Sequence, residues 1–467
     1  MTQAHTARSE RATTLHSALD AVFEEVKGDL ASLVAIPSIA WPAFDQSHVR
    51  ASAEAVAALA RKAGFEEVDV LTAQKPDGEP GSPAVVAARP APEGAPTVVL
   101  YAHHDVQPTG EESLWNTPPF EATESGDRIF GRGAADDKAG IMVHLTALRL
   151  LGEDLGVGVV LFVEGEEEAG SPSFRDFILR HRDRLAGDVF VVADSGNWAA
   201  GTPALTTSLR GMAALEFTVS TLDHAVHSGM YGGVVPDAAL AMTRLLASLH
   251  GEDGSVAVEG LVGETAAHVD YEEAALRADS GILDGVELIG TGTLASRVWS
   301  QPAVTVIGLD LPHVDVSSNT LQHSLRAKLS IRVAPGDTPE NALAAVKRHL
   351  TDHAPFGARV EFGEEEAGSP WRADTADPVV DTAMAALGEG FGTEAVQVGL
   401  GGSIPFIADL LEVFPQASIL VTGVEDPDAR AHSANESLYV PDFRRAIVAE
   451  ALLLERLGGR SAEGAGV

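Results

Sequence analysis

Hydrophobic residues follow two different spacings along the first part of the chain. Between residues 15 and 33 they recur at every third or fourth position, which predicts a helix with one apolar face. A second stretch with this spacing covers residues 49–63 and ends before Gly64, a residue typical of helix C-termini. Short, continuously apolar runs such as 97–101 and 157–163 predict strands that are buried on both faces.

Strands and helices alternate in this way through residue 192. Further strands are predicted at 68–71, 84–88 and 188–192, and further helices at 141–151 and 174–181. This alternation, with strands that are apolar on both faces, is typical of an α/β sheet covered by helices on both sides.

The pattern changes beyond residue 210. Strands and helices of this middle block are predicted at 212–219, 236–249, 304–309, 325–333 and 338–350. We expect the block to be a separate α+β domain, because it is long enough to have a core of its own. From Asp377 the earlier alternation returns and continues to a final helix at 442–457.

Composition narrows the classes of protein that fit. The 467 residues include 32 Lys and Arg against 68 Asp and Glu, a formal net charge of −36, and such a surface repels nucleic acid and anionic membranes. Cysteine is absent, which excludes disulfides, thiol nucleophiles, thiolate zinc sites and iron–sulfur clusters. No apolar run has the roughly 20 residues of a membrane span, and the first residues lack the apolar segment of a secretory signal. We therefore expect a cytoplasmic protein that binds neither nucleic acid nor membranes.

Polar residues follow several of the predicted strands directly. The candidates are His103, His104, Asp105, the acidic run 164–168, Asp194 and His432, together with a glycine-rich turn with adjacent carboxylates at 131–138. In open α/β sheets ligands bind beyond the carboxyl ends of the strands, so these residues can meet at one edge. Each has an ordinary alternative when taken alone: a solvated loop histidine, a surface turn or an exposed acidic face. Their joint placement favours a binding site.

The residue types point to a metal centre. Adjacent carboxylates at the end of a buried strand repel each other unless a cation lies between them. Two imidazoles and three carboxylates suit Zn²⁺ first, with Mn²⁺ or Co²⁺ as alternatives. Five ligands exceed what one catalytic zinc binds while it keeps an open position, so a dinuclear site with a bridging carboxylate fits better, its ions ~3.5–4 Å apart. One glutamate of the acidic run can then bind metal while its neighbour acts as a general base.

Five parts of the chain resemble, in order and spacing, the motifs of the dinuclear zinc exopeptidases: 101–108 (YAHHDVQP), 131–138, 164–171, Asp194 and 431–436. This family includes carnosinase and other dipeptidases, glutamate carboxypeptidase, aminoacylase, acetylornithine deacetylase and succinyl-diaminopimelate desuccinylase. The resemblance implies an α/β catalytic domain, formed by residues 1–208 and 373–467, in which helices sandwich a mixed sheet. It implies that residues 209–372 are an inserted α+β lid and dimerisation domain, through which the chain forms a homodimer.

The resemblance also implies the metal ligands. His103 and Asp194 hold one Zn²⁺, Glu168 and His432 hold the other, and Asp136 bridges the two ions. The two ions then activate a bridging water that attacks the peptide bond.

Two further roles near the metals follow from the same resemblance. Glu167 is implied as the general base that takes the proton of the water, and Asp105 as the carboxylate that orients His103. The bond between Asp136 and Asp137 resembles one that is cis in this family.

Substrate-binding residues are implied in the middle block and near its end. His227, within 223–233, resembles the histidine that reaches into the partner's active site and polarises the scissile carbonyl. Arg332 resembles the arginine that binds the carboxylate of a small peptide substrate, with Asn319 as a further contact. The loop receiving the same carboxylate is Gly401, Gly402 and Ser403.

The subclass is indicated by finer features. Asp stands at position 194 as in dipeptidase members, and the string 209–211 (LRG) is carnosinase-like, so we expect a metallo-dipeptidase. The alternative on the same fold is an N-acyl-amino-acid amidohydrolase, and a third reading is a non-catalytic metal-binding protein. Two positions depart from the family pattern: Gly399 and Leu400 replace the usual Arg-Glu, and Ala139 replaces a usual Gly.

Overall fold

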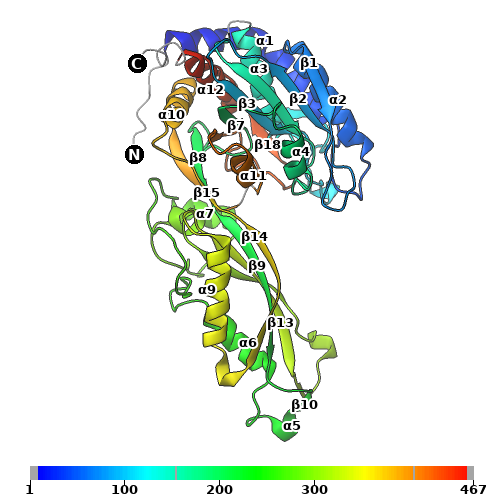
Figure 1. The fold of residues 1–467 in the computed structure, drawn as a ribbon, viewed down its shortest axis with the longest axis vertical. Coiled ribbons are helices and arrows are strands. Elements are labelled where there is room, and N and C mark those ends of the chain that lie inside the picture. Colours follow the sequence, from blue (N-terminus) through cyan, green and yellow to red (C-terminus); the bar gives the residue numbers. More distant parts are fainter. Residues whose placement is uncertain (1–8, 153–154, 403–404, 460–467) are drawn as a thin grey trace. The chain divides into compact units, whose positions relative to one another are not determined.

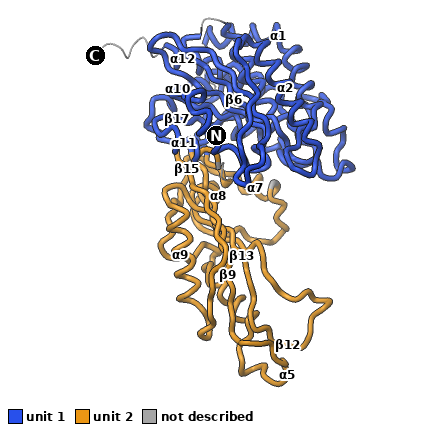
Figure 2. The backbone as a smooth tube through the Cα atoms, turned by 45° about the vertical axis from the view of Figure 1, so that its right-hand side comes forward, with its two compact units in different colours: residues 1–207, 373–398, 409–467 blue, residues 208–372, 399–408 orange. Residues whose placement is uncertain are grey.

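The computed structural model describes residues 9–152, 155–402 and 405–459. The chain divides into two compact units, which Figure 2 colours separately. The first unit comprises residues 1–207, 373–398 and 409–467, and the second comprises 208–372 and 399–408. The second unit therefore includes residues 399–408, whereas the sequence analysis assigned all of 373–467 to the first. This short segment, which joins the end of β16 (Val396–Leu400) to the start of α11 (Pro405–Val413), carries no pattern that would have indicated this.

The first unit is built on a mixed sheet (Figure 1). In spatial order its strands are β1 (Glu67–Leu71), β2 (Ala84–Arg89), β6 (Gly158–Glu164), β3 (Thr97–His103), β7 (Val189–Val192), β17 (Ser418–Val421) and β8 (Ala204–Leu209). The central strands β6, β3, β7 and β17 run parallel to their neighbours in this series, while β1, β2 and β8 pair antiparallel. The carboxyl ends of the four parallel strands thus meet at one edge.

Helices cover both faces of this sheet, which explains why its central strands are continuously apolar. Alternate residues of β3, such as Val98 and Leu100, join one large core. The helices contributing to this core are α1 (Glu10–Val34), α2 (Ser47–Lys62), α3 (Lys138–Leu151), α10 (Pro378–Phe391) and α12 (Val440–Gly459). On the other face Phe162 of β6 stacks on Phe177 of α4 (Phe174–Arg180), with ring centroids 5.1 Å apart. The predicted α/β fold is confirmed.

The second unit has an antiparallel sheet with helices on one face. Its strand order is β11 (Ala303–Leu309), β13 (Ser324–Val333), β9 (Gly211–Ser220) and β14 (Arg359–Gly368). The inward residues of β9 and β13 alternate with polar ones and form a core with α6 (Ala238–Ala247) and α9 (Pro339–Asp352). Strand β14 was not predicted, because nearly all its side chains are exposed and its sequence is rich in glycine and glutamate.

Shorter elements complete the fold. In chain order they are η1 (Glu112–Leu114), β4 (Thr123–Ser125), β5 (Arg128–Phe130), β10 (Val226–His227), α5 (Ser228–Tyr231), α7 (Glu273–Ser280), α8 (Leu294–Trp299), η2 (Val314–Val316), β12 (Thr320–Leu321), η3 (Pro355–Gly357), β15 (Trp371–Arg372), β16 (Val396–Leu400), α11 (Pro405–Val413) and β18 (Ser437–Tyr439). Within the described residues, no helix combines the length and apolar character that crossing a bilayer requires. The cytoplasmic location stays a prediction.

Candidate active site

The loops at the carboxyl edge of the first unit's sheet carry the expected metal ligands. His103 is the last residue of β3, Glu168 lies in the turn after β6, and Asp194 follows β7. Asp136 lies in the turn before α3, and His432 lies in the loop after β17. The structure brings all five together, although they are far apart in the sequence.

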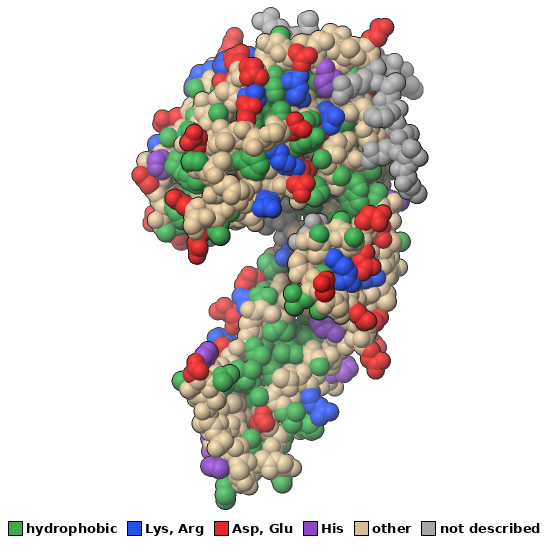
Figure 3. All heavy atoms as spheres, turned by 180° about the vertical axis from the view of Figure 1, so that it is seen from behind, with side chains coloured by type: hydrophobic (Ala, Val, Ile, Leu, Met, Phe, Trp, Pro, Cys, Tyr) green, Lys and Arg blue, Asp and Glu red, His purple; other side chains and the backbone are tan. Residues whose placement is uncertain are grey.

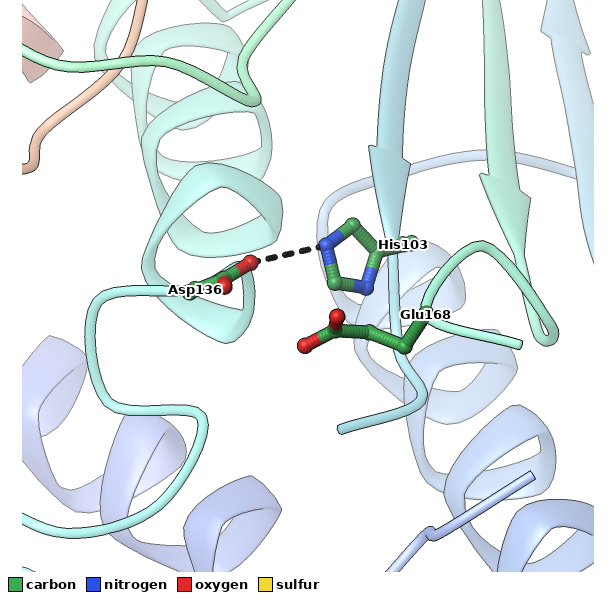
Figure 4. A group of neighbouring side chains, drawn as sticks. All are labelled: His103, Asp136 and Glu168. Carbon is green, nitrogen blue, oxygen red and sulfur yellow. Dashed lines mark hydrogen bonds and ion pairs between the residues drawn. The ribbon is translucent and has the colours of Figure 1, made fainter. Parts of the chain in front are cut away.

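Asp136 lies between the two histidines. Its Oδ1 is 3.0 Å from Nε2 of His103, the contact drawn in Figure 4, and its Oδ2 is 3.0 Å from Nε2 of His432. His432 Nε2 is also 3.1 Å from Oε2 of Glu168, and His103 Nε2 is 3.9 Å from Oδ1 of Asp194. Each oxygen of Asp136 therefore faces a different imidazole, and each imidazole faces one further carboxylate.

The carboxylates of this cluster favour positive charge on the histidines between them. Burial opposes a charged imidazole, but hydrogen bonds with Asp105 and Asp136 raise the pKa of His103 well above its usual value. Hydrogen bonds with Asp136 and Glu168 raise the pKa of His432 to about 11. The same carboxylates that raise the pKa of each imidazole also suit a divalent cation beside it.

Two groups of donors satisfy the spacing of a metal site. Ligand atoms of His103, Asp136 and Glu168 lie within 4.8 Å of one another, as do those of His103, Glu167 and Asp194. In Figure 4 the carboxylates of Asp136 and Glu168 lie beside the His103 ring. The donor set of imidazoles and carboxylates, and its spacing, therefore fit divalent ions.

Glu167 is the acid beside this cluster that sequence analysis assigned as a base. Burial, together with the charge of Asp194, raises the pKa of Glu167 well above its usual value. Burial likewise raises the pKa of Asp194. A carboxylate with a raised pKa is suited to take up and release a proton near neutral pH.

Asp105 connects the loop of Glu167 to the strand that ends at His103. Its carboxylate accepts hydrogen bonds from the backbone N–H groups of Glu167 and Glu168, both at 3.1 Å. The same carboxylate is 3.5 Å from Nδ1 of His103, and the carbonyl oxygen of Asp105 is nearer, at 3.1 Å. Asp105 is fully buried, so these contacts hold the two loops in one arrangement.

Glu436 was missed as a functional position, although it ends a motif that the sequence analysis quoted. It is fully buried, and its carboxylate accepts hydrogen bonds from Nη1 of Arg132 at 2.6 Å and from the backbone N–H groups of Gly133, Ala135 and Asp136 at 3.0–3.2 Å. Glu436 therefore fixes the turn that presents Asp136. The signal was weak: Glu436 follows polar residues and directly precedes the short strand β18, which does not reveal a partner about 300 residues away.

Two other acids complete the surroundings. Glu425, in the loop after β17, was also missed; burial next to Asp136 and Asp194 raises its pKa well above the usual value. Asp137 accepts the N–H of His103 at 3.2 Å, and the bond between Asp136 and Asp137 is cis, as the resemblance led us to expect.

The expected substrate-binding residues that the structure describes belong to the second unit, and they fall into two places. His227 on β10 pairs with Thr320 on β12, and the N–H of Ser228 donates to the carbonyl of Asn319, so His227 and Asn319 are neighbours. Both side chains are exposed. Arg332 lies near the opposite end of β13, eight residues beyond Ser324, or roughly 27 Å at about 3.4 Å per residue.

The loop that contains Gly401 and Gly402, here called the glycine loop, lies near Arg332 and not near His227. Gly401 accepts a hydrogen bond from Arg210, whose pKa the nearby Arg332 helps to lower. Gly402 is exposed, and Ser403 lies outside the described residues.

Comparison with known proteins identifies the family and the relatives of the chain. Residues 99–456 match peptidase family M20/M25/M40. The chain is 37% identical over 375 residues to the cysteinylglycine-S-conjugate dipeptidase of Corynebacterium striatum, covering 78% of this chain and 82% of that protein. It is 27% identical over 457 residues to the Cys-Gly metallodipeptidase dug1 of Schizosaccharomyces pombe, covering 93% and 95% of the two chains. The crystal structure of human carnosine dipeptidase 1 has the same fold, with a TM-score of 0.75 at 22% identity over 97% of this chain and 100% of that one.

These findings test three of the expectations. The resemblance to this exopeptidase family is confirmed, and so is the prediction of an enzyme. The named relatives are dipeptidases, which confirms the predicted class and does not favour the alternative of an N-acyl-amino-acid amidohydrolase. The chain therefore belongs to peptidase family M20/M25/M40.

Proposed function

We propose that this peptidase hydrolyses dipeptides with two divalent metal ions, bridged by Asp136. The observation that supports this most directly is that each oxygen of Asp136 lies 3.0 Å from a different imidazole. In the proposal His103 and Asp194 hold one ion, and Glu168 and His432 hold the other. Zinc is our first choice because imidazole and carboxylate ligands suit it, with manganese or cobalt as alternatives.

The metals and Glu167 have separate tasks. When bound, the ions would supply Lewis-acid polarisation of the substrate carbonyl and lower the pKa of a water molecule. Glu167 takes the proton of the attacking water at its carboxylate and delivers it to the nitrogen of the leaving amine. The two hydrogen bonds from the Glu167 and Glu168 amides to Asp105 hold Glu167 next to the metal ligands while it does so.

Residues of the second unit would recognise the ends of the substrate. Arg332 and the Gly401–Ser403 amides would bind the C-terminal carboxylate, since a guanidinium matches the geometry of a carboxylate. His227 and Asn319 cannot reach the same small molecule within one copy, because an extended dipeptide spans only about 7 Å. We therefore propose that they serve the active site of a second copy, with His227 polarising the scissile carbonyl.

This arrangement requires a homodimer through the second unit. Hydrophobic side chains are exposed on the surface of this unit (Figure 3). Those of β11 and the segment after it are Val306, Ile307, Leu309, Leu311, Val314 and Val316. Exposed apolar residues in such number are typical of a protein interface and support the proposed dimer.

Metal analysis combined with a substrate panel tests the function. The protein is loaded with Zn²⁺, assayed with Cys-Gly, β-Ala-His and Ala-Gly beside N-acetyl-alanine, then stripped with a chelator and reloaded. We expect two ions per chain, cleavage of at least one dipeptide, loss of cleavage on stripping and recovery on reloading. Stoichiometric metal with no cleavage of any dipeptide would refute the proposal.

A further inference from the structure

Arg210 lies beside Arg332 in the second unit. It directly precedes β9, and Met212, two residues further on, pairs with Arg332 on β13. Such diagonal positions on adjacent antiparallel strands are about 7–8 Å apart, within reach of long side chains. Burial and the nearby charge of Arg332 lower the pKa of Arg210 to about 10, so the Arg210 guanidinium is still cationic at neutral pH.

The hydrogen bonds of Arg210 go to backbone carbonyls. The residue is 8% exposed, and its Nε donates to the carbonyl of Gly401 at 3.1 Å. Its Nη1 donates to the carbonyls of Arg297 and Gln301 at 3.4 and 3.3 Å, at the C-terminal end of α8. These contacts hold the glycine loop against the sheet, and none of them neutralises the charge.

Neither arginine forms an ion pair with a carboxylate among the residues that the structure describes. Arg326, on the same strand as Arg332, differs in this respect, because its Nε is 3.0 Å from the Asp310 carboxylate. A chain with a net charge of −36 has many acids with which to pair its arginines. Two adjacent unpaired guanidiniums, one of them buried, are therefore suited to an anion from outside the chain.

The glycine loop leaves one edge of Arg210 approachable. A Cβ added at Gly401 would lie 3.0 Å from Nη2 of Arg210, so the absence of a side chain at Gly401 keeps the space beside this nitrogen free. A Cβ added at Gly402 would meet nothing within 4 Å. Nη2 is also the nitrogen of this guanidinium that has no hydrogen bond to the described residues, since Nε and Nη1 donate to backbone carbonyls.

We propose that Arg210 and Arg332 together bind the C-terminal carboxylate of the substrate, with Arg210 contributing its Nη2 edge while its Nε and Nη1 position the loop. This inference rests on the proposed function, because it needs a dipeptide as substrate. It adds a second cation to the carboxylate site, and the planar guanidinium provides paired N–H groups that match a carboxylate.

The test compares a substrate that has the carboxylate with one that lacks it. Steady-state kinetics of Arg210→Met, Arg332→Met and the wild type are measured on Ala-Gly and on its C-terminal amide. Arg326→Met is the matched control, since it removes an exposed arginine from the same strand. Loss of a charge-assisted hydrogen bond predicts a fall in kcat/KM of about 10- to 100-fold on Ala-Gly for each of the first two variants. On the amide we expect no change.

The outcomes separate binding from positioning. An equal loss on both substrates, or no loss on Ala-Gly, would overturn the proposal, because Arg210 would then only support the loop. Arg210→Lys keeps the charge but lacks the paired N–H groups of a guanidinium. Its kcat/KM on Ala-Gly should lie between those of the wild type and Arg210→Met, with circular dichroism showing that all variants are folded.

A binding measurement keeps the inference independent of turnover. Calorimetric titration of Ala-Gly and its amide is carried out on metal-loaded Glu167→Gln and on Glu167→Gln with Arg210→Met. We expect the second substitution to weaken only Ala-Gly binding; equal affinities in the two proteins would count against Arg210. A wild type that cleaves no dipeptide refutes the proposed function, whereas this titration still decides whether Arg210 binds a carboxylate.

Discussion

Replacing Glu436 by glutamine should destabilise the first unit more than any exposed substitution. The Glu436 carboxylate accepts two hydrogen bonds at each oxygen: from Arg132 and Gly133 at Oε2, and from Ala135 and Asp136 at Oε1. Whichever oxygen becomes an amide nitrogen, two buried donors lose their acceptor. The Arg132 guanidinium, whose side chain is 1% exposed, also loses its counter-charge.

The free energy of unfolding should fall by about 3–5 kcal/mol, the cost of leaving one partner of a buried ion pair uncompensated. Urea unfolding of the metal-free protein measures this change, with tryptophan fluorescence as the signal. Trp115 contributes to the signal, since Cζ of Arg132 lies 5.4 Å from the centroid of its ring. Glu455→Gln is the matched control, because Glu455 pairs with Arg11 at the surface and the loss there should stay within about 1 kcal/mol.

The Glu436 variant also tests the position of Asp136. Because the Asp136 amide is one of the donors, we expect the metal affinity of Glu436→Gln to fall together with its stability. A free energy of unfolding as close to the wild type as that of Glu455→Gln would refute the reasoning. Lost stability with unchanged metal affinity would mean that Glu436 supports the fold without positioning Asp136.

Three further predictions concern the base, the bridge and a buried pair. Glu167→Gln should keep the wild-type metal content while kcat falls at least about 10²–10⁴-fold, and turnover near the wild type would remove Glu167 from the mechanism. Asp136→Asn should lower the metal-to-protein ratio measured by atomic emission, since both imidazoles lose a shared carboxylate; a full complement of metal would contradict the bridging position. His144 is buried with Nδ1 2.9 Å from Glu450, and this contact raises its pKa against the effect of burial. A raised histidine pKa stabilises the fold below the unfolded value of about 6.5 and stops doing so as pH rises through the folded value, so the stability gap between wild type and Glu450→Gln should shrink with rising pH. A gap that widens with pH would show that the pair is not charged as described.

The amino-acid sequence by itself determined the elements and the chemistry of the site. Apolar runs buried on both faces predicted strands such as β3 and β6, and three- to four-residue spacing predicted helices such as α1, because these patterns reflect local geometry and the burial of one face. Candidate residues for the proposed metal site were recognised for a similar reason, and the family resemblance then assigned their roles. Acids and histidines directly after buried strands stand out, and parallel strands bring their carboxyl ends to one edge.

Only the tertiary structure decided which of several acids and arginines have partners. Glu436 and Arg132 are about 300 residues apart in the sequence and meet at 2.6 Å, a contact that no local pattern encodes. The unpaired state of Arg210, the place of residues 399–408 in the second unit and the separation of His227 from Arg332 are likewise properties of long-range packing. The sequence shows which charged and polar groups the chain has. Which of them form pairs, and which can contact the same small molecule, depends on the distant segments that the fold brings together.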